Sequence, residues 1–180
     1  MVQKFKDLYS AEVIPYLKET FDYKNLHQIP KIEKIQINRG LGVAAQNKKV
    51  LDKSVKEFRS ITGQQPLVTK AKKSIAGFKL REDIELGITV TLRRNKMYSF
   101  LDRLINLALP RIRDFQGLDP NKFDKFGNYT FGLTDQLIFP EIEYEQVDQQ
   151  LGFNITIVTS AKNPKEGLAL LTKMGLPFRQ

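Results

Sequence analysis

The feature that most constrains the fold is a strict two-residue alternation between residues 86 and 93. Aliphatic side chains alternate there with small or polar ones, which is the pattern of a β-strand that has one face in a core and the other in solvent. The apolar positions are Leu86, Ile88, Val90 and Leu92, and the other face consists of Gly87, Thr89, Thr91 and Arg93. A strand of this kind favours an antiparallel sheet that is covered on one side and open on the other.

Other segments either repeat this one-sided pattern or show the period of a helix. Strands are expected over residues 32–38, 67–69, 128–139 and 153–159, and helices over 3–21, 47–63, 95–110 and 163–175. Pro15 is expected to kink the first helix, because its ring displaces a backbone hydrogen bond. Together, these strands and helices predict an α+β fold, with a largely antiparallel sheet and helices packed on one face. We expect a single domain over residues 1–180, with an N-terminal half of about 1–80 and a C-terminal half of about 84–180 in one fold.

Charge indicates the class of partner. Lys and Arg number 29 against 20 Asp and Glu, which gives a formal net charge of +9 and a pI near 9.6. Such an excess suggests a polyanion, either nucleic acid or an anionic membrane. A membrane-spanning role is disfavoured, since no apolar run approaches the ~20 residues that a spanning helix needs. The first residues show neither a secretory signal nor a transit peptide, so we expect the protein to act where it is made, or after processing.

Catalysis is disfavoured by the types of residue that the chain lacks. It has no cysteine and a single histidine, His27, which lies in a polar segment with no nucleophile signature beside it. The glycines of I-N-R-G-L-G at 37–42 match neither a dinucleotide fingerprint nor a P-loop, and a turn after a strand explains them. The acidic residues are scattered, and this histidine has no candidate partner for a metal. We therefore predict no enzymatic activity, no cofactor and no metal site.

Two regions are candidates for binding nucleic acid. One is a stretch between Thr69 and Arg81 that has five cations, no acid and one aromatic side chain, a combination suited to phosphate contacts and base stacking. Its candidate residues are Lys70, Lys72, Lys73, Phe78, Lys79 and Arg81. The other is the polar face of Thr89, Thr91 and Arg93. A solvated basic loop and ordinary strand chemistry are the respective alternatives, because Thr has a high β-propensity.

An acidic segment runs against the overall charge. Glu141, Glu143, Glu145 and Asp148 lie close together in P-E-I-E-Y-E-Q-V-D. Carboxylates avoid RNA, so this surface is expected to face either solvent or a basic protein.

Together these segments resemble one family, the bacterial-type ribosomal protein number five of the large subunit, which binds 5S rRNA. The resemblance covers almost the whole chain, in order and at similar spacing. It is carried by I-N-R-G-L-G at 37–42, I-T-G-Q-Q-P at 61–66, V-T-K-A-K-K-S-I-A-G-F-K-L-R-E at 68–82, V-T-L-R-R at 90–94, F-L-D-R-L-I-N-L-A-L-P-R-I-R-D-F-Q-G-L at 100–118, G-N-Y at 127–129, Q-L-I-F-P-E-I at 136–142 and I-T-I-V-T at 155–159.

The resemblance implies one α+β domain that docks on 5S rRNA through its sheet and helps to form the central protuberance of the large subunit. The positions that match the family's polar RNA contacts are Asn38, Gln64 and Thr91, to which we add Arg39 and Arg93 from their placement and Thr89 from the polar face of its strand. The basic loop matches one that reaches the peptidyl-site tRNA. The family also bridges to a basic protein in the head of the small subunit, and we expect Glu141, Glu143 and Glu145 to make that contact. The partners implied are thus 5S rRNA, large-subunit rRNA, peptidyl-site tRNA and neighbouring ribosomal proteins, with no membrane.

Some positions depart from the family's usual pattern. Asp83, Ile84 and Glu85 stand where Gly, a bulky residue and Pro are common, so the tRNA-facing loop is more acidic at its far end. Y-K-N-L-H-Q-I-P at 23–30 and G-L-P-F-R-Q at 175–180 resemble the cyanobacterial and plastid branch. The resemblance implies a ribosome in the plastid stroma or the bacterial cytoplasm, with the plastid slightly favoured. The alternatives are a generic RNA chaperone, which would bind unrelated RNAs equally well, and a protein scaffold, for which RNA would be dispensable.

Overall fold

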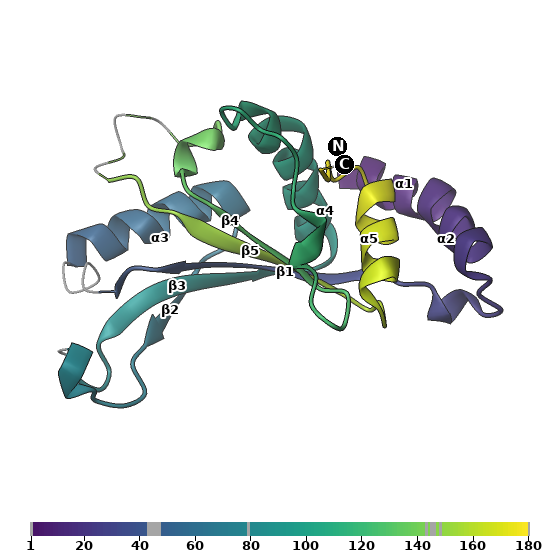
Figure 1. Cartoon of the computed structure of the whole chain (residues 1–180). Helices are drawn as coiled ribbons and strands as arrows, with labels where there is room; N and C mark the ends of the chain where they lie inside the picture. Colours follow the sequence, from purple (N-terminus) through teal and green to yellow (C-terminus); the bar gives the residue numbers. More distant parts are fainter. Residues whose placement is uncertain are drawn as a thin grey trace.

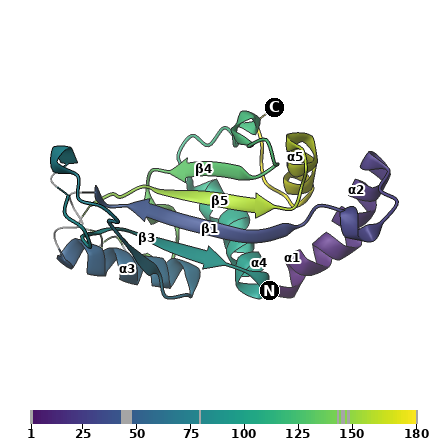
Figure 2. The same cartoon turned by 90° about the horizontal axis from the view of Figure 1, so that it is seen from below.

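The computed structural model describes residues 2–42, 48–78, 80–142, 144, 147 and 149–179. One antiparallel sheet runs through it, in the order β2-β3-β1-β5-β4 (Figures 1 and 2). Its strands are β1 (Ile32–Gly40), β2 (Leu67–Lys70), β3 (Glu85–Leu92), β4 (Tyr129–Leu133) and β5 (Phe153–Thr159). The central strand β1 comes from the N-terminal half, and both of its neighbours come from the C-terminal half, so the two halves share one sheet.

Helices lie on one side of this sheet. Figure 1 shows α3 and α4 above it, with α1, α2 and α5 packed at one end, and no helix of the described chain covers the face below. The α-helices are α1 (Val2–Leu8), α2 (Ile14–Phe21), α3 (Lys48–Thr62), α4 (Arg94–Arg103) and α5 (Pro164–Lys173). Shorter turns of helix are Tyr9–Val13, Leu26–Gln28, Ala76–Phe78, Leu104–Ala108, Leu109–Arg111, Pro120–Lys122 and Gln136–Ile138. The predicted α+β fold, with an antiparallel sheet and helices on one face, is confirmed.

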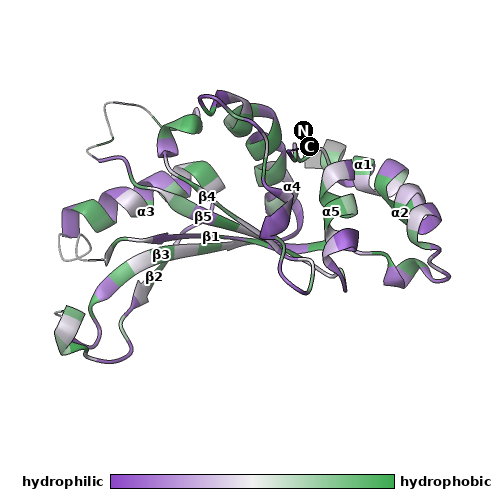
Figure 3. Cartoon of the chain, viewed as in Figure 1, coloured by the Kyte–Doolittle hydropathy of each residue, from purple (hydrophilic) through white to green (hydrophobic). Residues whose placement is uncertain are grey.

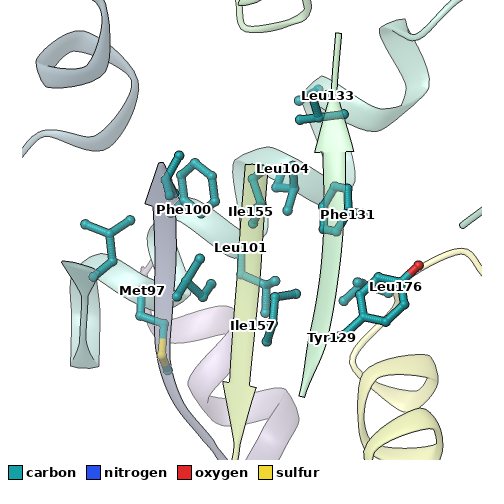
Figure 4. Packing of buried hydrophobic residues seen from close by; sticks show 14 of the residues in the cluster. Met97, Phe100, Leu101, Leu104, Tyr129, Phe131, Leu133, Ile155, Ile157 and Leu176 are labelled. Carbon is teal, nitrogen blue, oxygen red and sulfur yellow. The ribbon is translucent and has the colours of Figure 1, made fainter. Parts of the chain in front are cut away.

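The strand register brings apolar residues into line on the covered face. Ile37 of β1 lies opposite Val90 of β3 and Ile155 of β5, and Phe131 of β4 lies opposite Ile155. Side chains of α4 pack down onto this row, as the close-up in Figure 4 shows for Phe100 and its neighbours. Each such side chain stabilises the fold by roughly 1.5–3 kcal/mol through the apolar surface that it removes from water. Figure 3 shows the alternating hydropathy along β3 and α3 that produces these one-sided elements.

The first helix contains a wider, π-helical turn just before its proline. This turn covers Tyr9–Val13 between α1 and α2, with helical backbone angles at Leu8, Val13 and Ile14, and Pro15 follows in the first turn of α2. Proline has no backbone N–H to donate, so the irregular turn falls where the regular hydrogen-bond pattern of the helix is broken.

Two predicted boundaries were wrong, and one predicted cap forms in a different way. The strand expected over 128–139 ends at Leu133, because the Asp135 carboxylate accepts a hydrogen bond from the Leu137 N–H and starts a short 3₁₀ helix. The N-cap of α4 is Arg93 rather than Asn95. Asn163 does precede α5, but the Glu166 carboxylate accepts from the Lys162 N–H instead of closing a capping box with Asn163. The expected N-cap Asn47 lies outside the described residues.

Candidate nucleic-acid interface

The uncovered face of the sheet, here called the open face, presents hydroxyl and amide groups from four strands. The register aligns them in two cross-strand rows. One row is Thr91, Gln36, Thr156 and Thr130, and the other is Thr89, Asn38, Asn154 and Gly132. These rows carry no carboxylate, so RNA would meet hydrogen-bonding groups there without charge repulsion.

Local contacts hold this face in place. The Thr89 hydroxyl donates to the Ile37 carbonyl across the strand pair at 3.3 Å, and the Thr130 hydroxyl donates to that of Thr156 at 3.1 Å. Gln64 lies at the edge beside β3, where its side-chain amide donates to the Thr91 carbonyl at 3.1 Å. Gln64 thereby continues the hydrogen bonding of β3 beyond the point where its pairing with β2 stops.

A glycine allows two strands to approach closely at one end of the open face. A Cβ at Gly87 would lie 2.5 Å from the backbone oxygen of Arg39, a distance that real Cβ atoms essentially never show. Gly87 therefore allows β3 to approach β1 closely. Its cross-strand partner Gly40 has open space around the equivalent position.

Most of the residues predicted to contact RNA come together around the open face. Asn38, Thr89 and Thr91 lie on it, and Gln64 lies at its edge. Arg93 is exposed just beyond β3, at the N-terminus of α4. The structure thus places five of the proposed contact residues at one surface, and their binding to RNA stays a prediction.

Arg39 is the exception, and its predicted RNA contact is contradicted by its burial. Its side chain is 0% exposed and lies on the covered face, 2.6 Å from the Glu57 carboxylate. The guanidinium also donates to the Ser54 hydroxyl at 3.3 Å and the Leu151 carbonyl at 3.0 Å. Successive side chains in a strand point to opposite faces, so the residue after Asn38 must point away from the open face.

Arg39 acts instead as a structural link between β1, α3 and the segment before β5. Its guanidinium stacks over the Phe58 ring, 4.8 Å from its centroid, and lies 5.7 Å from that of Phe153. Burial lowers the pKa of the Arg39 guanidinium, an effect that the hydrogen bond and the charge of Glu57 partly offset. An arginine nevertheless stays charged in proteins, so this is a buried ion pair.

The basic stretch forms a hairpin that projects from the sheet (Figure 1). The Ala71 N–H donates to the Ile84 carbonyl at 2.8 Å, and Ile75 and Leu80 exchange two backbone hydrogen bonds of 3.0 and 3.1 Å. We name it the basic hairpin, residues 70–84. Its cations Lys70, Lys72, Lys73 and Arg81 are exposed, and its Phe78 is 69% exposed near the tip. The predicted site residue Lys79 lies outside the described residues.

The acidic segment is only partly described. The Glu141 carboxylate pairs with the Arg103 guanidinium of α4 at 2.6 Å, and both side chains are about a quarter exposed. Glu143 and Glu145 lie outside the described residues, whereas Tyr144 between them is 79% exposed. No local pattern in the sequence indicates that Arg103 fixes the start of this segment.

The chain's one histidine lies at the surface. His27 is exposed in a short 3₁₀ turn, where its backbone N–H donates to the Asn25 side chain. Within the described ranges, no group of three or more His, Asp or Glu residues could hold a metal ion. None of the helices described is both long and apolar enough to cross a membrane.

Comparison with known proteins matches both halves of the chain to one family. Residues 25–81 match the family described as ribosomal protein L5, and residues 85–178 match the model for the C-terminus of the same family. The large ribosomal subunit protein uL5c of Heterosigma akashiwo is 64% identical over 180 residues, which cover 100% of this chain and 99% of that protein. The uL5 protein of Microcystis aeruginosa is 60% identical over 179 residues, 99% of this chain and 100% of that protein. The uL5c protein of Porphyra purpurea is 58% identical over 180 residues, with 100% and 99% covered.

Proposed function

Since the chain belongs to the ribosomal protein L5 family, a structural constituent of the large ribosomal subunit and not an enzyme, we propose that it binds 5S rRNA through its open face. Its partners are rRNA and other ribosomal proteins, in a plastid or bacterial ribosome.

The observation that carries the proposal is the chemistry of the open face. Asn38, Thr89 and Thr91 form a neutral hydrogen-bonding surface on a rigid sheet, with Gln64 at its edge and Arg93 at its end. Uncharged donors and acceptors on a fixed frame suit the 2′-hydroxyls and base edges of a folded RNA. Phosphate contacts from cations at the rim would add affinity that depends on salt. By binding 5S rRNA in this way, the protein would help to form the central protuberance of the large subunit.

We propose that the basic hairpin reaches the peptidyl-site tRNA. It projects from the sheet with exposed cations along both arms and Phe78 near its tip. Cations suit tRNA phosphates, and an exposed aromatic ring can stack on a ribose or a base. The exposed acids Glu82 and Asp83 follow Arg81 on the return arm, so they lie nearer the base of the hairpin than Phe78 does.

The acidic segment is proposed as the bridge to a basic protein in the head of the small subunit. Glu141 is held by Arg103, and the exposed Tyr144 follows it, flanked in sequence by Glu143 and Glu145. Carboxylates around an aromatic side chain are complementary to a basic protein surface and would repel rRNA.

We also propose that the protein works in the plastid ribosome. Two of the three relatives named above are uL5c proteins, which supports this location.

The test is binding of the purified chain to 5S rRNA and to an unrelated structured RNA across a salt series. We expect selective 5S binding, weakened roughly 2- to 13-fold by Asn38→Ala or Thr91→Val, since one hydrogen bond contributes about 0.5–1.5 kcal/mol. Thr20→Val, at an exposed threonine on α2, is the matched control and is expected to bind as the wild type does. Equal affinity for both RNAs would favour a generic RNA chaperone and overturn the proposal.

A further inference from the structure

A second basic surface lies at one end of the sheet, beside the open face. It is a groove of about 570 Å³ between α1, the start of β1 and the start of α4. In Figure 2, α1 and α4 meet there next to the end of β3. We name it the basic groove, and its lining residues are Lys6, Lys31, Ile32, Glu33, Arg93, Arg94, Asn95, Met97 and Tyr98.

The charge of the basic groove is not balanced within the protein. Four exposed cations line it against one carboxylate, that of Glu33. In the part of the chain that the structure describes, no carboxylate lies within ion-pair distance of Lys6, Lys31, Arg93 or Arg94. Like charges gathered in a concave surface repel one another and raise the local potential, so an anion entering the groove would relieve that repulsion.

The framework of the groove is formed in the free protein. The backbone of Lys31 exchanges hydrogen bonds with Ser160, in which the Lys31 N–H donates to the Ser160 hydroxyl at 3.0 Å and the Ser160 N–H donates to the Lys31 carbonyl at 2.9 Å. The floor contains the buried side chains of Ile32 and Met97. A preformed site loses less conformational entropy when a ligand binds.

The start of α4 adds a second attraction for anions. Its first turn contains no acidic residue, and the N-cap Arg93 provides no side-chain acceptor for the first N–H groups. These N–H groups, at the positive end of the helix, favour a negative ligand. Arg94 adopts a left-handed backbone with φ of 53°, a costly conformation for a residue other than glycine.

We propose that the basic groove binds backbone phosphates of ribosomal RNA, and so continues the RNA-binding surface from the open face around the end of the sheet. Arg93 supports this continuity, because it lies just beyond the strand that carries Thr89 and Thr91 and also lines the groove. The inference rests on the proposed function, since it takes RNA as the ligand of the neighbouring face. The phosphates come either from 5S rRNA itself or from a large-subunit rRNA strand packed beside it.

The first experiment removes two cations that the open face does not share. Lys31→Gln/Arg94→Gln is compared with Lys24→Gln/Lys165→Gln, which removes the same charge at exposed positions outside the groove. Binding is measured to 5S rRNA and, separately, to deproteinised large-subunit rRNA over a salt series. Each lost phosphate contact lowers the slope of log affinity against log salt by roughly 0.7–0.9. We therefore expect the slope of the groove variant to fall by about 1.4–1.8 with one of the two RNAs.

The measurements with the two RNAs identify the source of the phosphates, and they separate the groove proposal from the open-face proposal. A smaller slope with 5S rRNA assigns the contact to that RNA, and a smaller slope with large-subunit rRNA alone assigns it to the neighbouring strand. Slopes equal to those of the control pair with both RNAs overturn the groove proposal. A failure of 5S selectivity, or a Thr91→Val variant with wild-type affinity, would instead overturn the open-face proposal and leave the groove slopes interpretable.

A cross-link checks the same contact within the ribosome. The chain contains no cysteine, so Lys31→Cys introduces a single thiol for a short photoreactive group. After assembly into large subunits, we expect the cross-link on an rRNA strand, whose sequence identifies the source. Cross-links to a ribosomal protein only, or to no macromolecule, would overturn the proposal. The same thiol placed at Lys24 is the control and is expected to give a different pattern.

Discussion

Asn38 and Arg39 are neighbours in β1, yet they belong to two different surfaces. Asn38 is exposed on the open face, whereas the side chain of Arg39 is completely buried against α3. The covered face holds the apolar rows and the buried ion pair, and the open face holds small polar side chains in register. A single step along the strand therefore separates the residues that stabilise the fold from those proposed to bind RNA.

Residue type alone therefore does not identify an RNA contact. Arginine is the usual residue for phosphate recognition, yet Arg39 is bound to Glu57 and stacked on Phe58. Asparagine and threonine carry no charge, but they occupy the accessible side. Three substitutions test whether the two faces have these separate roles.

The largest effect is expected for Arg39→Met. Removal of the guanidinium leaves the Glu57 carboxylate without its 2.6 Å partner, and breaking a buried pair typically lowers the free energy of unfolding by about 3–5 kcal/mol. Denaturant unfolding measures this loss. The exposed Arg93→Met is the matched control and should change stability by no more than about 0.5 kcal/mol.

A further variant tests the cause of that loss. Arg39→Met/Glu57→Met replaces both charges with apolar side chains and is expected to recover much of the stability, because no charge is then left buried without a partner. If Arg39→Met kept full stability but lost 5S rRNA affinity, the guanidinium would have to reach RNA, and our assignment of Arg39 to the covered face would be wrong.

An intermediate effect is expected for Gly87→Ala, which adds a methyl group at the crowded end of the open face. The new Cβ would lie 2.5 Å from the backbone oxygen of Arg39, which cannot move without shifting β1. We expect a loss of about 1–3 kcal/mol in unfolding free energy, as for other overpacked sites.

Gly40→Ala is the control for this substitution, because Gly40 pairs with Gly87 but has open space around its own Cβ position. It should be neutral, or stabilising by up to about 1 kcal/mol, since alanine restricts the unfolded chain. Equal effects at the two glycines would show that the close approach of β1 and β3 is not what requires Gly87.

The smallest effect on stability is expected for Thr89→Val, which keeps the shape of the side chain and removes its hydroxyl. That hydroxyl makes only a long hydrogen bond of 3.3 Å, so the free energy of unfolding should change by less than about 0.5 kcal/mol. Affinity for 5S rRNA is expected to fall by a factor of roughly 2–13. Thr156→Val, in the adjacent row on β5, measures how far the contact extends. A loss of stability without a loss of affinity would assign the Thr89 hydroxyl to the sheet.

Much of the fold could be predicted because period-two alternation directly reports which face of a strand is buried. The strand around Val90 and the final helix ending before Gly175 follow from such local signals. The same alternation separates Asn38 from Arg39, so the error at Arg39 came from its place beside Asn38 in the sequence, without regard to the face on which the alternation puts it. Contacts between distant segments leave no local pattern. The Arg103–Glu141 pair and the arrangement of Lys31 beside Arg94 therefore required the structure.

The order of the strands also determines when the open face is completed during synthesis. Asn38 lies between Thr89 and Asn154, so the rows of the open face stay incomplete until β5 has emerged. Pairings between such distant segments close slowly, because the loop between them must first lose its conformational freedom. A nascent chain that carries β1, β2 and β3 has only part of the open face, with one edge of β1 unfilled. The strand that carries Asn38 is thus paired on both edges only once Phe153–Thr159 has been made and added to the sheet.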